Sequence, residues 1–110
     1  MGVHQVRNVE LLLPYDKAFD LCVESLSLTK KCEIQDENRS QGKIFAKAGT
    51  TWKTWGDVIS FEIRKTGNDR IQVEVSSRPA MSTTLVDFGK NLENVETIVG
   101  FLNAHDESTG

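Results

Sequence analysis

The chain has 110 residues, of which 38% are hydrophobic and 26% are charged, and its formal net charge is −3. This length fits one globular domain, and the mixed, slightly acidic charge argues against non-specific nucleic-acid binding, which needs a concentrated basic face. No apolar run approaches the roughly 20 residues of a membrane-spanning helix, and no signal-peptide-like stretch follows Met1, so we expect a cytoplasmic protein.

The first predicted strand is followed directly by a helix. Val9, Leu11 and Leu13 alternate with polar or exposed positions, as in a strand with one buried face. Pro14 suits a first helical turn, where the missing N–H is not needed. Apolar side chains then recur at helical spacing over about four turns, at Tyr15, Phe19, Cys22, Val23 and Leu26.

Four further runs alternate between apolar and polar side chains. Their apolar positions are Cys32 and Ile34; Ile44, Ala46 and Ala48; Ile59, Phe61 and Ile63; and Ile71, Val73 and Val75. Because neighbouring side chains of a strand point to opposite faces, these runs predict a sheet with one apolar and one polar face. Residues 65–69 include Gly, Asn and Asp, which favour a hairpin turn between the last two strands.

A second helix closes the predicted domain. Asn91 is expected to be its N-cap, and Leu92, Val95, Val99 and Leu102 are expected to form its apolar stripe, flanked by Ile98 and Phe101. Residues 103–110 are polar, so we expect a disordered tail after a single domain at 1–102.

The element order predicts an α+β fold, in which a five-stranded bent antiparallel sheet carries two helices packed on one face. The order strand, helix, four strands, helix resembles the TBP-like and helix-grip (Bet v 1/START-like) group of folds. Residues 55–59 and 87–91 also look like patterns in small uncharacterised bacterial domains. The helix-grip group includes lipid-transfer and ring-cyclising proteins, so this resemblance implies a ligand site.

The polar face of the sheet is a poor ligand surface. It is expected to carry six charged side chains, with Phe45 as its only aromatic residue: Glu10, Lys43, Lys47, Glu62, Arg64 and Glu74. A lipid carrier needs an apolar concave sheet, and single-stranded nucleic acids are bound by stacked aromatics over a basic groove. We therefore expect this face to be solvated.

The loops at one end of the sheet are a more promising surface. Antiparallel pairing brings the start of the fourth strand beside the end of the fifth, and Lys30 and Lys31 are expected nearby. The predicted ligand- or partner-binding residues are Trp52, Trp55, Arg78, Lys90 and Asn91. The alternative is that a tryptophan packs onto the core while Asp87 and Asn91 cap backbone groups.

Enzyme chemistry has little support in the sequence. His4 and His105 lie near the two ends of the chain, and neither belongs to a nucleophile motif. Cys22 and Cys32 fall on apolar positions without Cys-x-x-Cys spacing, so we expect two buried thiols rather than a metal site. The sequence predicts no catalytic residue, no cofactor and no metal.

Three functions remain open at this stage. The first is a non-enzymatic binding or interaction module that uses the loop end for an unknown protein or a small polar or anionic ligand. The second is a helix-grip binder of a hydrophobic small molecule, or a cyclase-like enzyme, with an enclosed apolar pocket. The third is a self-associating structural domain that pairs edge strands. We expect a monomer or weak homodimer with neither a nucleic-acid nor a membrane partner.

Overall fold

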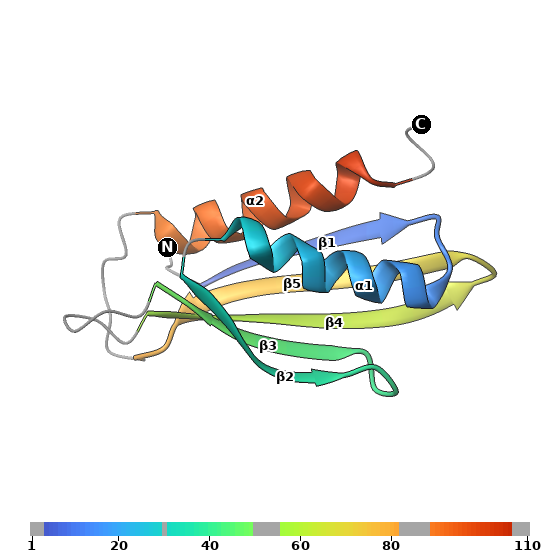
Figure 1. Ribbon diagram of the computed structural model, residues 1–110. Coiled ribbons are helices and arrows are strands. Elements are labelled where there is room, and N and C mark those ends of the chain that lie inside the picture. Colours follow the sequence, from blue (N-terminus) through green and yellow to red (C-terminus); the bar gives the residue numbers. More distant parts are fainter. Residues whose placement is uncertain (1–3, 30, 50–55, 82–88, 107–110) are drawn as a thin grey trace.

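Two helices lie on one face of a five-stranded antiparallel sheet (Figure 1). The computed structural model describes residues 4–29, 31–49, 56–81 and 89–106. The elements, in chain order, are β1 (Gln5–Leu11), α1 (Tyr15–Ser25), the 3-10 helix η1 (Leu26–Leu28), β2 (Cys32–Asn38), β3 (Lys43–Ala48), β4 (Asp57–Gly67), β5 (Arg70–Pro79) and α2 (Lys90–Ala104). This is the predicted α+β order.

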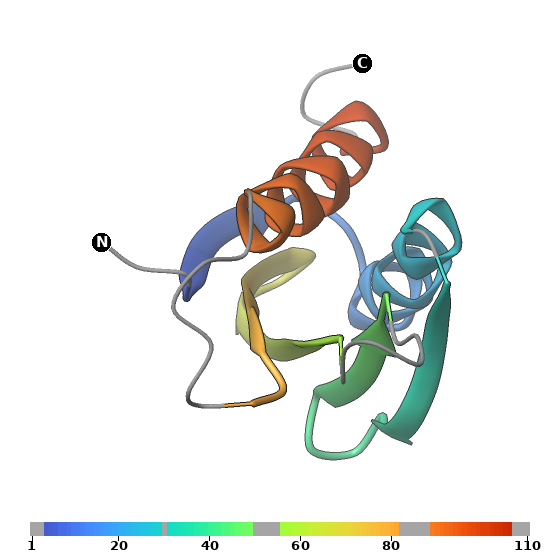
Figure 2. The same ribbon diagram turned by 90° about the vertical axis from the view of Figure 1, so that its left-hand side faces the viewer.

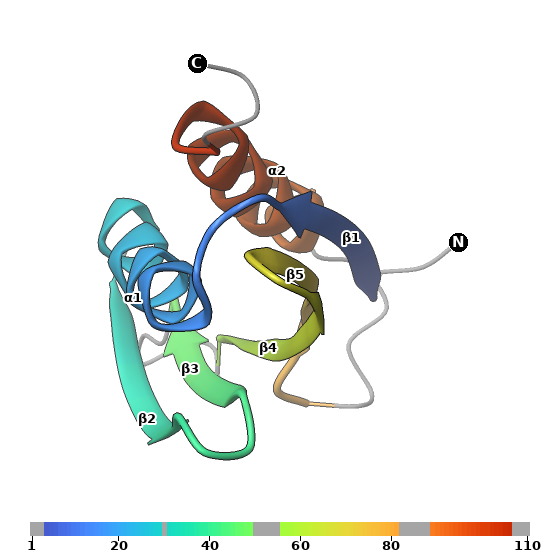
Figure 3. The same ribbon diagram turned by 90° about the vertical axis from the view of Figure 1, so that its right-hand side faces the viewer.

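The sheet is strongly curved, and the helices occupy its concave side. The strand order is β1-β5-β4-β3-β2, and every neighbouring pair is antiparallel. Seen from its two ends, the sheet bends around the helices (Figures 2 and 3). The helix α2 packs on β1 and β5, α1 contacts β4 and β5, and η1 contacts β2. The two edge strands are therefore β1 and β2.

The concave face carries the hydrophobic core, as the alternating pattern predicts. In the strands, the predicted apolar positions from Val9 to Val75 are buried except on β2, where Cys32 and Ile34 are half-buried because β2 is an edge. On the opposite face Phe45 is 40% exposed and Val6 is 39% exposed. The prediction of one apolar and one polar face is confirmed.

Several side-chain contacts hold α1 against the turn between β2 and β3. Arg39 in this turn donates hydrogen bonds to Asp16 (3.1 Å) and Asp20 (2.6 Å) of α1. Its guanidinium carbon lies 4.4 Å from the centroid of the Phe19 ring, within the range of a cation–π contact. Tyr15 adds a further contact, since its hydroxyl donates a hydrogen bond to the Arg39 carbonyl at 2.7 Å.

The start of α2 differs from the prediction. Gly89, with a φ of 78°, is the N-cap, and the helix begins at Lys90, so Asn91 lies inside the first turn rather than capping it. The face of α2 that is buried against the sheet carries Asn91, Val95, Ile98 and Leu102. Leu92, which was expected on the apolar stripe, is 42% exposed. The sequence pattern predicted the wrong start for the apolar stripe, because the first buried position of α2 is the polar residue Asn91.

The far end of α2 is ordered beyond the expected boundary. The helix continues to Ala104, and Asp106 is only 7% exposed, with its Oδ1 accepting a hydrogen bond from the Leu12 backbone N–H at 3.0 Å. The expected disordered tail therefore does not begin at Asn103, because residues 103–106 belong to the packed structure. No helix within the described ranges is long and apolar enough to cross a membrane.

Candidate functional site

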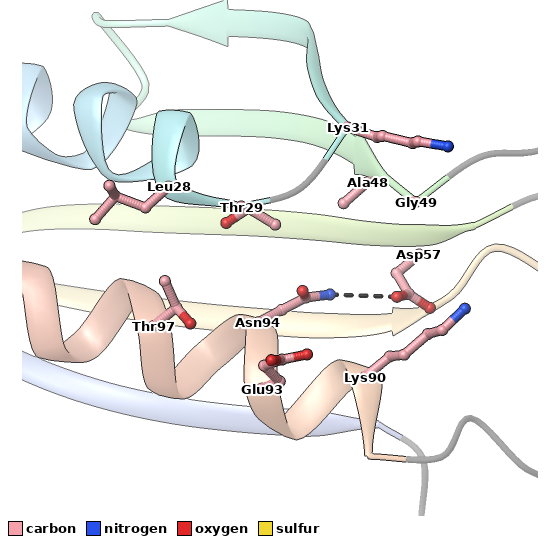
Figure 4. A pocket seen from close by; sticks show the side chains of 10 residues that line it. All are labelled: Leu28, Thr29, Lys31, Ala48, Gly49, Asp57, Lys90, Glu93, Asn94 and Thr97. Atoms are coloured by element: carbon pink, nitrogen blue, oxygen red, sulfur yellow. Dashed lines mark hydrogen bonds between the residues drawn. The ribbon is translucent and has the colours of Figure 1, made fainter.

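A pocket of about 290 Å³ lies between the two helices at one end of the sheet (Figure 4). Its walls come from η1, the residues around the end of β3 and the start of β4, and the first two turns of α2. The lining residues are Leu28, Thr29, Lys31, Ala48, Gly49, Asp57, Lys90, Glu93, Asn94 and Thr97. The pocket is partly open to solvent and combines apolar with charged walls.

Strand pairing and one loop contact assemble this pocket from distant parts of the sequence. Asp57 at the start of β4 is paired with Pro79 at the end of β5, as predicted for antiparallel neighbours. The Gly49 N–H donates to the Lys31 carbonyl at 3.2 Å, which ties the entry of β2 to the exit of β3. The prediction that these segments meet at one end of the molecule is confirmed.

Buried polar side chains connect the pocket wall to the base of α2. Asn94 donates through Nδ2 to Asp57 at 3.2 Å and to the Ser77 hydroxyl at 3.0 Å. Ser77 in turn donates its hydroxyl to the Asn91 side-chain oxygen at 2.6 Å. Ser77 and Asn91 are fully buried and Asp57 is 7% exposed. The chain Asp57–Asn94–Ser77–Asn91 fixes the first turns of α2 on the sheet and holds the Asp57 carboxylate in place.

Thr29 is an exception to the general rule that buried polar groups are paired. Its side chain is 9% exposed, and its Oγ1 is a buried side-chain oxygen without a hydrogen-bond partner among the described residues. The residue caps η1 through its backbone, since its N–H donates to the Leu26 carbonyl at 3.1 Å. Leaving a buried hydroxyl unpaired costs about 1–3 kcal/mol. Thr29 lines the pocket, but its Oγ1 is buried beneath the pocket surface.

The pocket contains two cationic and two anionic side chains. Lys31 and Lys90 are exposed, and their ammonium groups form no ion pair or hydrogen bond with another described residue. Their ammonium groups both extend toward the Gly49 end of the pocket, while the Glu93 carboxylate lies further along α2 (Figure 4). Asp57 is bonded to Asn94. The unpaired positive charge is therefore concentrated at one end.

The five residues predicted for the loop end have different positions. Lys90 lines the pocket, and Asn91 lies behind it as the buried partner of Ser77. Arg78 is exposed and follows the inward-facing Ser77, so it lies on the opposite face of the sheet, away from the pocket. Trp52 and Trp55 lie outside the described residues.

Sequence reasoning did not select Thr29, Asp57, Ser77 or Asn94, although a signal for two of them was present. Asp57 and Ser77 occupy the parity of Ile59 and Val75, the apolar parity of their strands. A polar residue at a core position must find a buried partner, and both residues lie at the same end of adjacent strands. That combination marks a polar cluster; Thr29 carries no comparable signal.

Thiol or metal chemistry has no evident support at this site. Burial raises the pKa of the Cys22 thiol to about 12, and burial also raises the pKa of Cys32, so both thiols favour the protonated form. Across the described ranges, no group of three or more His, Cys, Asp and Glu side chains is arranged to hold a metal ion.

A second depression, of about 460 Å³, lies between β1 and the β4–β5 hairpin. It is more open than the pocket between the helices, and most of its lining side chains are exposed: Asn8, Val9, Glu10, Thr66, Arg70 and Gln72. The Thr66 hydroxyl already donates to the Arg70 carbonyl at 3.2 Å. This depression is a shallow surface feature, and it offers no buried group in need of a partner.

Comparison with known proteins identifies the fold and not a specific relative. No family model matches the sequence, and the search of curated proteins found no match. Solved structures do match over nearly the whole chain, and uncharacterised bacterial proteins are among them.

Three structures represent the range of similar proteins. The Aha1 dimer from Colwellia psychrerythraea is 13% identical, with a TM-score of 0.65, over 99% of this chain and 100% of that one. The Zhui aromatase/cyclase from Streptomyces sp. R1128 is 12% identical, with a TM-score of 0.60, over 92% and 91% of the two chains. A START superfamily protein from Mycobacterium smegmatis is 12% identical, with a TM-score of 0.56, over 94% and 99%. This chain therefore has the helix-grip fold.

Proposed function

We propose that this protein binds a small organic molecule in the pocket between η1, β4 and α2, without catalysing a reaction. The observation that carries the proposal is the pocket itself, whose lining includes Thr29, a residue with a buried hydroxyl that has no hydrogen-bond partner among the described residues. A volume of about 290 Å³ equals about ten water molecules at roughly 30 Å³ each, which suits a small aromatic or short-chain compound.

The pocket has features of two of the functions expected from the sequence. It lies at the loop end, where a binding module was expected, and it also lies between helices and sheet, as in a ligand-binding helix-grip protein. It is neither enclosed nor uniformly apolar, because Lys31, Asp57, Lys90 and Asn94 contribute to its walls. These features favour a ligand with polar groups over a purely hydrophobic one.

The open face of the sheet supports the same choice of site. Glu62 and Glu74 lie directly opposite each other on β4 and β5, and Lys43 lies opposite Glu62 on β3. Exposed charges of this kind gain little from a neutral partner and are well solvated. Two proteins of similar fold, the aromatase/cyclase and the START superfamily protein, support a ligand site between the helices and the sheet by analogy only.

Chemical-shift mapping against a small-molecule fragment library tests this proposal. We expect binding fragments to shift the backbone amides of Thr29, Asp57 and Asn94 together. Thr97→Phe should fill the pocket from α2 and weaken binding at least tenfold, because the new ring occupies the ligand volume. Thr97→Ala is the matched control, since it changes the same position without filling the pocket, and it should bind within about twofold of wild type.

Two results would contradict the proposal. The first is a set of shifts centred on the open face, around Phe45, Ser60 and Ser76. The second is unchanged affinity in Thr97→Phe while the spectrum shows that the variant is folded.

A further inference from the structure

We propose that the ligand of this pocket is a small organic anion with a hydroxyl or carbonyl substituent. Lys31 and Lys90 bind the anionic group at the mouth, and Thr29 bonds the substituent inside the pocket. This inference rests on the proposed function, since it specifies the chemistry of the molecule that the pocket binds. It depends on side chains of this chain and not on any ligand of a similar fold.

The first argument is the position and the unpaired state of the two lysines. They come from opposite walls, Lys31 from the entry of β2 and Lys90 from the first residue of α2, and their ammonium groups extend toward the same end of the pocket (Figure 4). Neither ammonium group has an ion-pair partner within the described part of the chain. Two like charges that converge in a partly closed site favour a bound anion.

The acidic residues of the pocket do not neutralise this pair. Asp57 accepts a hydrogen bond from Asn94 at 3.2 Å. It forms no ion pair with Lys31 or Lys90, so its carboxylate oxygens lie more than 4 Å from these two lysine nitrogens. Glu93 is exposed, and its carboxylate lies along α2 away from the lysine end (Figure 4). Asp57 lies at the lysine end of the pocket (Figure 4), where two ammonium groups and one carboxylate leave an excess of one positive charge for a ligand anion.

The backbone of Lys31 provides an independent argument. Its φ of 49° lies in the left-handed region, where a residue with a Cβ is disfavoured. The other described non-glycine residue with positive φ is Asp69, which lies in a hairpin turn and is of a type that tolerates this conformation. Lysine has no such tolerance. An unfavourable backbone at a pocket mouth is typical of a residue whose side chain is needed there.

Thr29 accounts for the second group on the ligand. Its hydroxyl can both donate and accept, and rotation about χ1 between staggered positions exchanges the hydroxyl with the methyl group. The Thr29 Oγ1 is buried in the present rotamer, so a ligand hydroxyl or carbonyl supplies the missing hydrogen bond once this rotation turns the hydroxyl toward the pocket. Asn94, which lines the pocket from α2, uses its Nδ2 for Asp57 and Ser77, which leaves its side-chain oxygen as a further acceptor.

The experiment compares matched acids and amides as probes in NMR titrations. The probes are 4-hydroxybenzoate, its neutral analogue 4-hydroxybenzamide, and benzoate, which lacks the hydroxyl. We expect 4-hydroxybenzoate to bind at least threefold more tightly than either analogue, and added salt to weaken the acids more than the amide. If all three shift the pocket amides with equal affinity, the anion inference is wrong while the binding pocket stands. If no probe or library fragment shifts those amides, the proposed function is also wrong.

Charge variants locate the anion site. Lys31→Asn and Lys90→Gln should each weaken 4-hydroxybenzoate binding roughly threefold to tenfold and leave 4-hydroxybenzamide unchanged, as expected for single charge pairs at a partly exposed site. Lys65→Gln removes the same charge near the opposite end of the sheet, on β4, and should have no effect. Lys31→Asn should be at least as resistant to thermal unfolding as wild type, because asparagine tolerates a positive φ better. Wild-type affinity for the acid in both pocket variants would overturn the inference.

Thr29→Val tests the inner contact. Valine keeps the shape of threonine and removes the hydroxyl, so the preference for 4-hydroxybenzoate over benzoate should disappear. The midpoint of thermal unfolding should stay equal or rise, because a buried unpaired hydroxyl is lost, and this separates a lost contact from misfolding. A preserved preference in the folded variant would remove Thr29 from the site.

Discussion

Polar residues at buried positions define this site at the level of single residues. Ser77 and Asn91 take core positions on β5 and α2 and bond each other at 2.6 Å, although neighbouring core positions are aliphatic. Replacing them with aliphatic residues would remove the bond that orients Asn94 toward Asp57. Their position next to the pocket explains why polar groups are present in an otherwise apolar core.

Cys22 makes the stability of the protein depend on pH in the alkaline range. Its pKa is about 12 in the folded protein, because burial disfavours the thiolate, whereas the ordinary value is 9.0. The folded state therefore keeps a proton that the unfolded chain releases above pH 9. This contribution to stability is fully present below pH 9 and is lost as the pH rises toward 12.

The corresponding prediction concerns the slope of stability between pH 9 and 10.5. Well above pH 9, the free energy of unfolding of wild type should fall more steeply than that of Cys22→Ala, by up to about 1.4 kcal/mol per pH unit. Urea denaturation at several pH values measures both slopes. Cys32→Ala is the control, since Cys32 is only half-buried, and it should retain most of the wild-type slope. Equal slopes for wild type and Cys22→Ala would show that Cys22 is not buried as described.

At the level of elements, the turn between β2 and β3 holds the sheet and α1 together. Arg39 binds Asp16 and Asp20 of α1, while the Gly42 carbonyl accepts a hydrogen bond from the Ile63 N–H at 2.7 Å. Gly42 has a φ of 68°, and a Cβ at this position would collide with the Ile63 carbonyl oxygen. Both the conformation and the close approach require glycine here.

Two glycine substitutions separate these requirements. Gly49 has a similar φ of 72°, but a Cβ there would meet no atom within 4 Å. We expect Gly49→Ala to lower the free energy of unfolding by about 1 kcal/mol through backbone strain alone. Gly42→Ala should cost about 2–4 kcal/mol, because the collision adds to the same strain. Urea denaturation of both variants gives the difference, and equal losses would contradict the close approach of the turn to β4.

The register of α2 is the clearest difference at this scale between expectation and structure. Sequence periodicity placed Leu92 on the buried stripe, whereas Asn91 takes that position and Leu92 is 42% exposed. Hydrophobicity favoured leucine, but the position faces Ser77, which offers a hydrogen bond instead of an apolar contact. Local sequence could not show this, because the partner lies 14 residues away on another element.

At the scale of the whole molecule, the exposed edges of the sheet bear on self-association. β2 is an edge strand with a bulge between Ile34 and Asp36, and it carries exposed Glu33 and Glu37. Bulges and like charges are features by which natural sheets avoid pairing edge to edge. A second copy of β2 across a two-fold axis would bring these acids together.

We therefore expect a monomer in solution at moderate ionic strength. Sedimentation velocity should show one monomeric species, and replacing Glu33, Asp36 and Glu37 with their amides should increase association because the repulsion is removed. The triple amide replacement of Glu10, Glu62 and Glu74 on the open face, which changes the net charge equally, is the control. A stable dimer of the wild-type chain would contradict this expectation and favour the self-associating structural domain.

The fold follows from the sequence to a large extent. The alternating runs ending in Leu13, Ile34, Ala48, Ile63 and Val75 predict the strands and their buried face, because a side-chain period of two is a local property of the backbone. Pro14 and the spacing of Phe19 and Cys22 likewise define α1. Antiparallel pairing also predicted that the start of β4 and the end of β5 lie at the same end of the molecule.

Only the tertiary structure decided which side chains meet there. Thr29, Asp57 and Asn94 come from η1, β4 and α2, and their distances depend on how both helices pack on the curved sheet. Arg78 and Ser77 are neighbours in the sequence but lie on opposite faces of the sheet, and Ser77 on the inner face is the one that bonds to Asn94 of the pocket wall. Sequence patterns are local and report burial, whereas a binding site depends on contacts between distant segments, which packing alone determines.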